Sequence, residues 1–206
     1  MTRKLVFATR NRGKLVELEA LVEPLGIQVL SAADLPSLPE VEEDGATFEE
    51  NAVKKALAVA RASGLPSLAD DSGLVVDALG GAPGVRSARF AGPSADDRAN
   101  NEKLLELLGN LPSEERGAHF CCHMALADPA SPGGELVHTT SGRCDGQILC
   151  APRGEGGFGY DPLFLVPELG QTFAELPREV KNRISHRAKA LLAMRELLEA
   201  SLGAET

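Results

Sequence analysis

Short apolar runs alternate along this chain with segments whose apolar residues recur at helical spacing, and this alternation constrains the fold most. Residues 4–9 form a short apolar run that is typical of a buried strand. Residues 13–22 follow with leucines at helical spacing, and residues 27–30 predict a second strand. We therefore expect the chain to open with a strand, a tight loop and a helix.

A second helix has a clear start signal in the sequence. The segment Thr47-Phe48-Glu49-Glu50 is a capping box, in which a threonine and a glutamate satisfy backbone N–H groups at a helix start. It predicts a helix that runs to about Ser63 and is ended by Gly64. The preceding residues 33–44 are rich in proline and acidic residues and predict a loop.

The next part of the chain mixes short apolar runs with glycine. Residues 68–71 and 74–76 predict two short strands on either side of Ser72-Gly73. Residues 80–92 predict a glycine-rich loop, and residues 94–108 predict a helix.

The C-terminal part predicts more strands and a last helix. We expect residues 118–127 and 135–149 to form long, paired strands. Residues 151–161 predict a glycine-rich loop, and residues 163–166 predict another strand. Residues 185–202 have the apolar side of an amphipathic helix.

Together these elements predict an α/β fold with a mixed central sheet flanked by helices. A chain of 206 residues is long enough to bury a proper core. No stretch has the composition of a flexible linker, so we expect residues 1–206 to form a single domain in which any two lobes share the chain. Aromatic residues make up 4% of the sequence, so the core must rely on leucine, valine and alanine.

The net charge of −9 argues against long nucleic acid as a partner, because such proteins usually carry a basic stripe and none is visible here. A small polyanion stays compatible, since a metal ion and a few cations can invert the field inside one cleft. The sequence has no evident signal peptide and no apolar stretch long enough to span a bilayer. With its four cysteines interpreted as reduced core residues, we expect a cytoplasmic protein that does not bind membranes.

The first candidate site is the loop between the first strand and the first helix. It reads Thr9-Arg10-Asn11-Arg12-Gly13-Lys14. Backbone N–H groups and the positive end of the helix dipole meet there, which suits a phosphate, and Lys14 adds a mobile positive charge. The spacing is not that of a Walker A loop. The alternative is a polar loop that only caps the helix.

The second candidate site is the segment Asp70-Asp71-Ser72-Gly73. Two adjacent carboxylates are costly to bury unless a cation or hydrogen bonds compensate them. Glycine permits a sharp turn that would aim Asp71 and Ser72 into a cleft, where hard oxygen ligands suit Mg²⁺. The alternative is a solvated turn. The acidic run Glu42-Glu43-Asp44 offers a further metal ligand only if its loop faces Asp71.

A third candidate is the glycine-rich segment Gly154-Glu155-Gly156-Gly157-Phe158-Gly159-Tyr160-Asp161. Its spacing matches a dinucleotide-binding pattern, but Pro162 and a strand follow where that pattern needs a helix, so we reject this interpretation. What remains is a backbone that presents Phe158 and Tyr160 for stacking on a base and Asp161 as a hydrogen-bond acceptor.

The last candidate combines Lys181 with Ser185-His186-Arg187. We expect Ser185 to be the N-cap of the last helix, which places His186 and Arg187 in its first turn. Cations at a helix N-terminus are unfavourable, so their presence hints at a bound anion or carbonyl oxygen. The alternative is a pair of exposed basic residues.

In this order, the motifs resemble those of the inosine/xanthosine triphosphate pyrophosphatases, also called Ham1-like proteins. The resemblance covers residues 5 to about 192, and Arg10 departs from it where the family tends to have a small residue. The matching stretches are Ala8-Thr9-Arg10-Asn11-Arg12-Gly13-Lys14, Thr47-Phe48-Glu49-Glu50-Asn51-Ala52, Leu68-Ala69-Asp70-Asp71-Ser72-Gly73-Leu74, Gly80-Gly81-Ala82-Pro83-Gly84-Val85, Gly157-Phe158-Gly159-Tyr160-Asp161-Pro162 and Ser185-His186-Arg187.

The resemblance implies two lobes around a central nucleotide-binding cleft, a homodimer, and hydrolysis of ITP, dITP and XTP to monophosphate and pyrophosphate with one Mg²⁺ per subunit. Glu42 and Asp71 would bind the Mg²⁺, Asp71 would also be the proton acceptor, and Ser72 would contact the substrate. The triphosphate would be held by Thr9, Arg10, Asn11, Arg12, Gly13 and Lys14. The base and sugar would be surrounded by Phe158, Gly159, Tyr160, Asp161, Lys181, His186 and Arg187.

The identity of the general base, the group that accepts a proton from the attacking water, stays open at this point. Water would attack the α-phosphorus, but a carboxylate bound to a metal is a poor proton acceptor. Asp71 would alternatively hold Mg²⁺ and orient water, with Asp70 or Glu43 sharing the work. A donor such as His186 or Arg187 would accept the C6 oxygen of hypoxanthine or xanthine and be left unpaired by adenine, at a cost of about 1–3 kcal/mol.

Three other functions are compatible with the sequence. The chain would alternatively be a Maf-like pyrophosphatase that acts on modified pyrimidine nucleotides, a nucleotide sensor without turnover, or an acidic interaction module. The Asp70-Asp71 pair argues against the sensor.

Overall fold

The computed structural model describes residues 3–32, 35, 38–130 and 136–203. The chain divides into two compact units. The first unit comprises residues 1–71, 122–142 and 187–206, and the second comprises residues 72–121 and 143–186. The chain therefore passes from one unit to the other several times, and three of its strands contribute residues to both.

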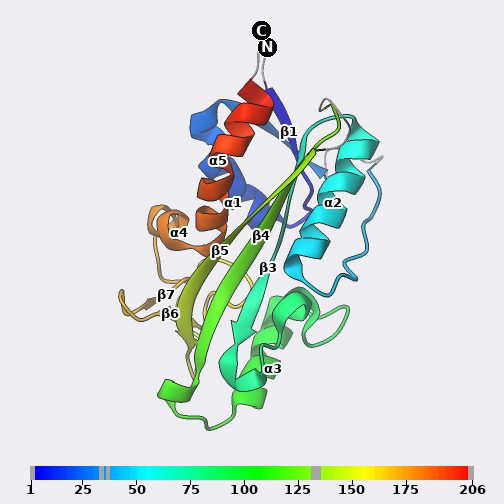
Figure 1. Cartoon of the computed structure of the whole chain (residues 1–206). Helices are drawn as coiled ribbons and strands as arrows, with labels where there is room; N and C mark the ends of the chain where they lie inside the picture. The colour runs from blue at the N-terminus through cyan, green and yellow to red at the C-terminus, as the bar shows by residue number, and fades with distance from the viewer. Residues whose placement is uncertain (1–2, 33–34, 36–37, 131–135, 204–206) are drawn as a thin grey trace. The chain divides into compact units, whose positions relative to one another are not determined.

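The described strands form one seven-stranded sheet in the order β2-β1-β3-β4-β5-β6-β7 (Figure 1). Strand β1 pairs in parallel with β2 and β3, whereas β6 pairs antiparallel with β5 and β7, so the sheet is mixed, as predicted. The strands are β1 (Arg3–Phe7), β2 (Ile27–Ser31), β3 (Ser67–Val76), β4 (Gly117–Asp128), β5 (Leu136–Ile148), β6 (Phe164–Val166) and β7 (Gln171–Thr172).

The helices flank this sheet, also as predicted (Figure 1). None of the helices in the described ranges is long and apolar enough to cross a membrane. The α-helices are α1 (Arg12–Val22), α2 (Phe48–Ser63), α3 (Asp97–Leu108), α4 (Arg178–Ile184) and α5 (His186–Gly203). Short 3₁₀ helices are η1 (Glu23–Leu25), η3 (Asp77–Leu79), η4 (Gly84–Arg89) and η5 (Ser113–Glu115).

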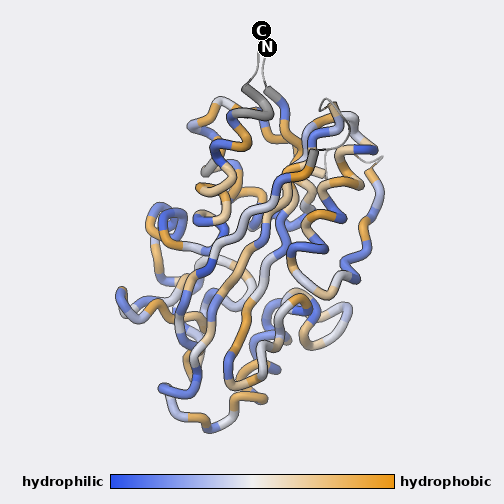
Figure 2. Tube along the Cα trace, in the orientation of Figure 1, coloured by the Kyte–Doolittle hydropathy of each residue, from blue (hydrophilic) through white to orange (hydrophobic). Residues whose placement is uncertain are grey.

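Helix α2 confirms the predicted Thr47 cap and the glycine stop, but the reciprocal bond of a capping box is not formed to Thr47. The hydroxyl of Thr47 accepts the N–H of Glu50 at 3.1 Å, and Gly64 ends the helix in the left-handed region at φ +69°. The Glu50 carboxylate accepts the N–H of Ala46 at 2.7 Å, one residue before the cap. Hydrophobic and hydrophilic residues alternate along this helix (Figure 2), which gives it one face for the core.

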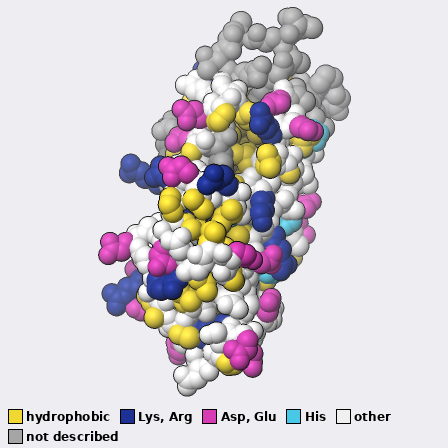
Figure 3. Space-filling view, turned by 90° about the vertical axis from the view of Figure 1, so that its left-hand side faces the viewer, with side chains coloured by type: hydrophobic (Ala, Val, Ile, Leu, Met, Phe, Trp, Pro, Cys, Tyr) yellow, Lys and Arg dark blue, Asp and Glu magenta, His cyan; other side chains and the backbone are white. Residues whose placement is uncertain are grey.

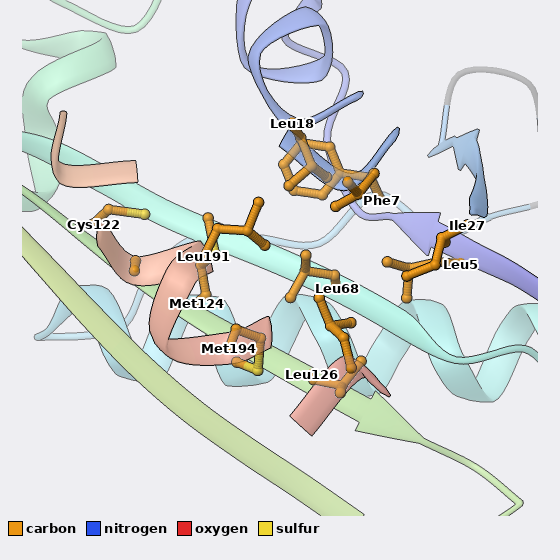
Figure 4. Close-up of a cluster of buried hydrophobic side chains, with 13 residues drawn as sticks. Leu5, Phe7, Leu18, Ile27, Leu68, Cys122, Met124, Leu126, Leu191 and Met194 are labelled. Carbon is orange, nitrogen blue, oxygen red and sulfur yellow. The ribbon is translucent and has the colours of Figure 1, made fainter. Parts of the chain in front are cut away.

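The core of the first unit has helices on both faces of the sheet. Side chains alternate between the faces along a strand, so Leu5 and Phe7 pack with α1 and α5, whereas Val6 packs with α2. Figure 1 shows α2 on the opposite side of β1 from α1 and α5. Figure 4 shows the cluster that contains Leu5 and Phe7, in which Leu18 of α1 and Leu191 of α5 also lie.

The second unit has its own core, with more of the aromatic residues. The rings of Phe120 and Phe164 tilt against each other at a centroid distance of 4.7 Å, and Phe173 stacks on Phe120 at 5.7 Å. Leu104 and Leu108 attach α3 to this cluster. Among the described residues, each unit therefore has its own core.

The predicted turn at Ser72-Gly73 is wrong, because β3 runs without interruption from Ser67 to Val76. Gly73 does not have a positive φ. A Cβ atom at this position would lie 2.6 Å from the carbonyl oxygen of Gly84 and would also meet Ser87. The glycine therefore allows η4 to approach the strand closely, and it does not bend the chain.

The sequence analysis also missed two short elements, β7 and α4. The N–H of Ser185 donates to the carbonyl of Lys181 at 2.9 Å, so Ser185 ends α4 directly before α5 begins. Residues 33, 34, 36 and 37 of the predicted loop and residue 135 of a predicted strand lie outside the described residues.

Candidate active site

The loop from Thr9 to Lys14 presents the start of helix α1, as expected. The side chain of Asn11 caps the helix by accepting the N–H of Lys14 at 3.2 Å, and the N–H of Asn11 donates to the Thr9 hydroxyl at 3.2 Å. The first turn contains no acidic residue that would offset the positive end of the helix dipole. Arg10 and Arg12 are exposed, and Gly13 is half-buried, so this helix start suits an anion.

Lys14 joins this loop to strand β3 within the first unit. Its ammonium lies 3.2 Å from Oδ1 and 3.1 Å from Oδ2 of Asp70. The Asp70 carboxylate is fully buried and also accepts hydrogen bonds from Nη2 and Nε of Arg187 at 3.1 and 3.3 Å. Arg187 in turn pairs with Glu17 of α1. The phosphate-loop segment and the acidic segment therefore meet.

The surroundings of Asp70 determine its ionisation. Burial alone raises its pKa, but the positive charges of Lys14, Arg187 and Lys55 outweigh burial and hold the pKa of Asp70 well below its usual range. Its two oxygens are engaged by Lys14 and Arg187. These contacts favour a structural role for Asp70 as their counter-ion over a role as general base.

Asp71 points to the other face of the strand, because successive side chains of β3 alternate. Oδ2 of Asp71 accepts a hydrogen bond from Nδ2 of Asn51 at 2.9 Å, and Oδ1 lies 3.9 Å from the ammonium of Lys55. Both partners come from α2. The adjacent carboxylates Asp70 and Asp71 therefore have different partners and do not form a carboxylate pair.

Burial raises the pKa of Asp71, and the nearby positive charges of Lys55 and Lys14 only partly oppose this. A carboxylate in this situation would be stabilised by a further cation, and its hard oxygen atoms fit Mg²⁺. Among the described residues, no three His, Cys, Asp or Glu side chains gather as a metal site. Mg²⁺ commonly uses one or two protein carboxylates together with substrate phosphates, so Asp71 fits that ion.

Lys55 and Asn51 were not singled out in the sequence. Lys55 is buried, and its ammonium donates to Glu43 Oε1 and to the Asp70 carbonyl, both at 2.7 Å. Burial lowers its pKa, but Asp70, Asp71 and Glu43 outweigh burial and raise the pKa of Lys55. The sequence feature that could have identified Asn51 and Lys55 is their spacing of four residues, which places both on the core face of α2. Glu42, the predicted metal ligand, is exposed, whereas its neighbour Glu43 reaches Lys55.

The second unit brings together the predicted residues Phe158, Asp161 and Lys181. The ammonium of Lys181 lies 2.6 Å from Oδ2 of Asp161, which also accepts the N–H of Phe158 at 3.0 Å. The same ammonium lies 5.0 Å from the centroid of the Phe158 ring. His186 stacks on Phe120 at a centroid distance of 4.8 Å in the same unit.

Tyr160 and Arg187, which were both predicted to surround the base and sugar, are buried. Tyr160 is buried in the core of the second unit, and its hydroxyl donates to the carbonyl of Ser87 at 2.9 Å, so its ring is not exposed for stacking. Burial raises the pKa of this hydroxyl. Arg187 is 2% exposed and belongs to the first unit, where it binds Asp70 and Glu17.

The predicted site residues thus fall into two sets, one in each unit. The first set contains Thr9, Arg10, Asn11, Arg12, Gly13, Lys14, Glu42, Asp71 and Arg187. The second set contains Ser72, Phe158, Gly159, Tyr160, Asp161, Lys181 and His186. Ser72 is a half-buried residue of β3 that directly follows Asp71.

Known proteins resemble this chain over nearly its whole length. A model of the Ham1 family matches residues 5–197. The dITP/XTP pyrophosphatase of Geobacter sulfurreducens is 59% identical over 198 residues, which cover 96% of this chain and 97% of that relative. The dITP/XTP pyrophosphatase of Bacillus subtilis is 48% identical over 198 residues, which cover 96% of this chain and 98% of that relative.

Solved structures agree with these relatives. The Ham1 protein of Coxiella burnetii superposes with a TM-score of 0.84 at 42% identity, covering 96% of this chain and 99% of its own. The dITP/XTP pyrophosphatase of Mycobacterium abscessus superposes with a TM-score of 0.72 at 44% identity, covering 95% of this chain and 99% of its own.

Proposed function

The chain belongs to the Ham1 family, and from this premise we propose that it hydrolyses the non-standard purine nucleotides dITP, XTP and ITP to monophosphate and pyrophosphate. Relatives named dITP/XTP pyrophosphatase are 48–59% identical to nearly the whole chain, which supports the same substrate class here. The observation that carries the proposal is the 3.1 Å contact between Lys14 of the phosphate-type loop and Asp70, the neighbour of Asp71.

The residues of the first unit would bind the phosphate chain. The N–H groups at the start of α1 and the ammonium of Lys14 attract phosphate oxygens. Asp70 and Arg187 keep Lys14 at the helix start, and Lys55 adds a second buried positive charge on the Asp71 side of the strand. Hydrolysis of a phosphoanhydride depends mainly on such positioning and charge neutralisation.

Asp71 would hold Mg²⁺, with Glu42 or Glu43 as a second ligand. When bound, this ion supplies neutralisation of phosphate charge and activation of water. Asp71 itself would orient the attacking water toward the α-phosphorus. Asn51 fixes the orientation of the carboxylate through its 2.9 Å hydrogen bond.

The Phe158, Asp161 and Lys181 cluster of the second unit would bind the base. Phe158 offers a half-buried aromatic ring, and Lys181 offers hydrogen-bond donors to a carbonyl oxygen. His186, packed on Phe120, is a further donor of this unit. Oxygen at C6 of hypoxanthine or xanthine accepts hydrogen bonds from such groups, whereas the amino group of adenine does not.

Product analysis tests the proposed reaction. Purified protein with Mg²⁺ and dITP in ¹⁸O-water should yield dIMP and pyrophosphate, with the ¹⁸O in dIMP because water attacks the α-phosphorus. Release of dIDP and phosphate, or ¹⁸O in the pyrophosphate, contradicts the proposal. A panel that includes dATP, dGTP and modified pyrimidine nucleotides tests selectivity, and preference for a pyrimidine would favour the Maf-like alternative.

The variant Asp71→Asn separates an enzyme from a nucleotide sensor. We expect hydrolysis of dITP to fall by about 10²–10⁴-fold, the usual contribution of a positioned acid–base group. Nucleotide binding, measured by calorimetry with Mg²⁺ and dITP, should stay measurable. Normal turnover by this variant would contradict the role of Asp71, and wild-type binding without turnover would favour the sensor.

We also propose that the protein acts in the cytoplasm as a homodimer. Hydrophobic side chains gather near the middle of one face of the molecule (Figure 3). The described residues include three exposed large hydrophobic side chains, Leu107, Leu169 and Leu192, the last of them 70% exposed. Sedimentation velocity tests the dimer, since a monomer at micromolar concentration contradicts it.

A further inference from the structure

Helix α3 holds one residue of the glycine-rich loop from both of its backbone polar groups. The N–H of Gly159 donates to Oδ2 of Asp97 at 2.7 Å, and the carbonyl of Gly159 accepts a hydrogen bond from Nδ2 of Asn101 at 2.8 Å. Asp97 and Asn101 are four residues apart and so lie on one face of α3. We call residues 157–161 the Phe158 loop.

The helix that provides these contacts is itself anchored within the second unit. Leu104 and Leu108 pack in the core of this unit. The side chain of Asn100 accepts the N–H of Ala91 at 2.8 Å and donates to the carbonyl of Ala88 at 3.2 Å. Asp97 and Asn101 therefore bind Gly159 from a fixed helix and not from a second loop.

The other end of the Phe158 loop reaches the proposed base-binding cluster. Asp161 accepts the N–H of Phe158 at 3.0 Å and the ammonium of Lys181 at 2.6 Å. Gly159 follows Phe158 directly and adopts the left-handed region at φ +61°. Because the loop is short, a shift of Gly159 moves Phe158 relative to Lys181.

Asn101 makes these contacts at a cost. Its Nδ2 also donates to the carbonyl of Asp97 at 2.8 Å, whereas its buried Oδ1 has no hydrogen-bond partner among the described residues. An unmatched buried acceptor is unfavourable for stability. The amide is therefore oriented for the carbonyl of Gly159, although this orientation does not satisfy all of its own polar atoms.

We propose that Asp97 and Asn101 are positioning residues that keep the Phe158 loop in the geometry needed to bind a purine base. They would determine KM and base selectivity and leave phosphate hydrolysis in the first unit unchanged. This inference rests on the proposed function, because it assigns the base to the Phe158 loop.

Steady-state kinetics with dITP and dATP on the full-length protein with Mg²⁺ tests this inference. For Asp97→Ala and Asn101→Ala we expect KM for dITP to rise by about tenfold, since each lost hydrogen bond weakens the loop geometry, while kcat changes by less than about twofold. The preference for dITP over dATP should fall as well, because the donors near Phe158 are proposed to recognise the C6 oxygen that adenine lacks. Asp97→Asn keeps an acceptor oxygen for the N–H of Gly159 and should recover much of the wild-type KM.

Arg98→Ala and Glu102→Ala are matched controls, because these residues form an exposed ion pair on the same helix. Both controls should keep the wild-type KM. Thermal melts verify that every variant is folded at the assay temperature. If Asn101→Ala does not fold, Asn101→Ser is used in its place.

Three outcomes would overturn the inference. These are an unchanged KM in the alanine variants, a fall of kcat at constant KM, or an equal loss in Asp97→Asn and Asp97→Ala. If the wild-type protein releases no pyrophosphate from dITP, it is the proposed function that fails, and this is evident before any variant is compared.

Discussion

Asp70 and Asp71 are neighbours in sequence, but their surroundings shift their pKa values in opposite directions. Asp70 is surrounded by Lys14 and Arg187, which hold its pKa well below its usual range after outweighing burial. Burial raises the pKa of Asp71, and the cations near it do not reverse this. Removing the charge of Asp70 should therefore lower the stability of the folded protein, and removing the charge of Asp71 should raise it.

Asp70→Asn should destabilise the protein strongly. It leaves the half-buried Lys14 and the buried Arg187 without their shared counter-ion, and breaking a buried pair in this way costs about 3–5 kcal/mol. Because the folded pKa is lowered, the stability from Asp70 is present above its ordinary value of 3.8 and is lost as pH falls below that value.

Urea unfolding at pH 7 and pH 3 measures this effect. The difference between wild type and Asp70→Asn should be large at pH 7 and smaller at pH 3. Glu199→Gln is the control, since Glu199 belongs to an exposed ion pair with Arg195, and such pairs contribute about 0–1 kcal/mol. Equal stability of Asp70→Asn and wild type at pH 7 would contradict the counter-ion role.

Asp71→Asn should stabilise the folded protein at neutral pH although it lowers activity by about 10²–10⁴-fold. The raised pKa means that the folded state favours the protonated carboxyl, so ionisation of Asp71 lowers stability as pH rises through 3.8 to the folded pKa. Asparagine removes this loss and still offers an oxygen to Asn51. Differential scanning calorimetry at pH 7 without metal should give a higher Tm, by about 2–4 °C for each kcal/mol gained. A lower Tm would show that Lys55 needs the Asp71 charge.

The sequence predicted the residue types of the site better than their partners. The resemblance implied that the Lys14 loop and Asp71 serve one nucleotide, and Lys14 does contact Asp70, the neighbour of Asp71. Which face each aspartate occupies was not predictable, because a turn was expected at Gly73 where β3 continues. Lys55 was missed for the same reason, since its partners lie on the Asp71 side of that strand.

At the scale of elements, β3 is the feature that organises the site. Its alternation sends Asp70 toward α1 and α5 and sends Asp71 toward α2, with the apolar neighbours Leu68 and Ala69 following the same two faces. The strand can run past residue 73 because glycine leaves room for Gly84 and Ser87 of η4.

Gly73→Ala tests this explanation against the alternative of a turn. The added Cβ would meet a carbonyl oxygen and the Ser87 side chain, so we expect a loss of about 1–3 kcal/mol from overpacking. Gly64→Ala is the comparison, because its Cβ would meet nothing within 4 Å but φ is +69°. That strain costs roughly 1–2 kcal/mol.

Urea unfolding of Gly73→Ala and Gly73→Ala/Ser87→Gly distinguishes the two causes. Removing the Ser87 side chain should recover part of the loss in the double variant if close approach is the reason. No recovery, with a loss equal to that of Gly64→Ala, would favour a conformational role for Gly73.

Elements with a long periodic pattern or a cap could be predicted, and the short ones could not. The capping box and Gly64 set the bounds of α2, and the leucine spacing gave α1. Helix α4 has seven residues and β7 has two, which is too short for a periodic pattern. Their formation depends on packing in the second unit, which local sequence does not encode.

At the scale of the whole molecule, the proposed chemistry is divided between the two units. The first unit has the buried cations and Asp71, which suit phosphate and metal. The second has Phe158 with Lys181 and Asp161, which suit a base. The net charge of −9 makes this local arrangement of cations essential for binding a polyanion.

Binding of Mg²⁺ and pyrophosphate should therefore stabilise the protein without any nucleoside. A ligand at 100 times its Kd adds about 2.7 kcal/mol to the folded state, which corresponds to a rise in Tm of roughly 5–10 °C for a chain of this size. Differential scanning fluorimetry with Mg²⁺ and pyrophosphate measures this rise, and EDTA should remove most of it. Sulfate at matched ionic strength controls for general salt effects. In Asp71→Asn, the part of the Tm rise that depends on Mg²⁺ should be lost. In Asp97→Ala the whole Tm rise should remain, because Asp97 lies in the unit proposed to bind the base. An equal rise in wild type and Asp71→Asn would place the metal away from Asp71.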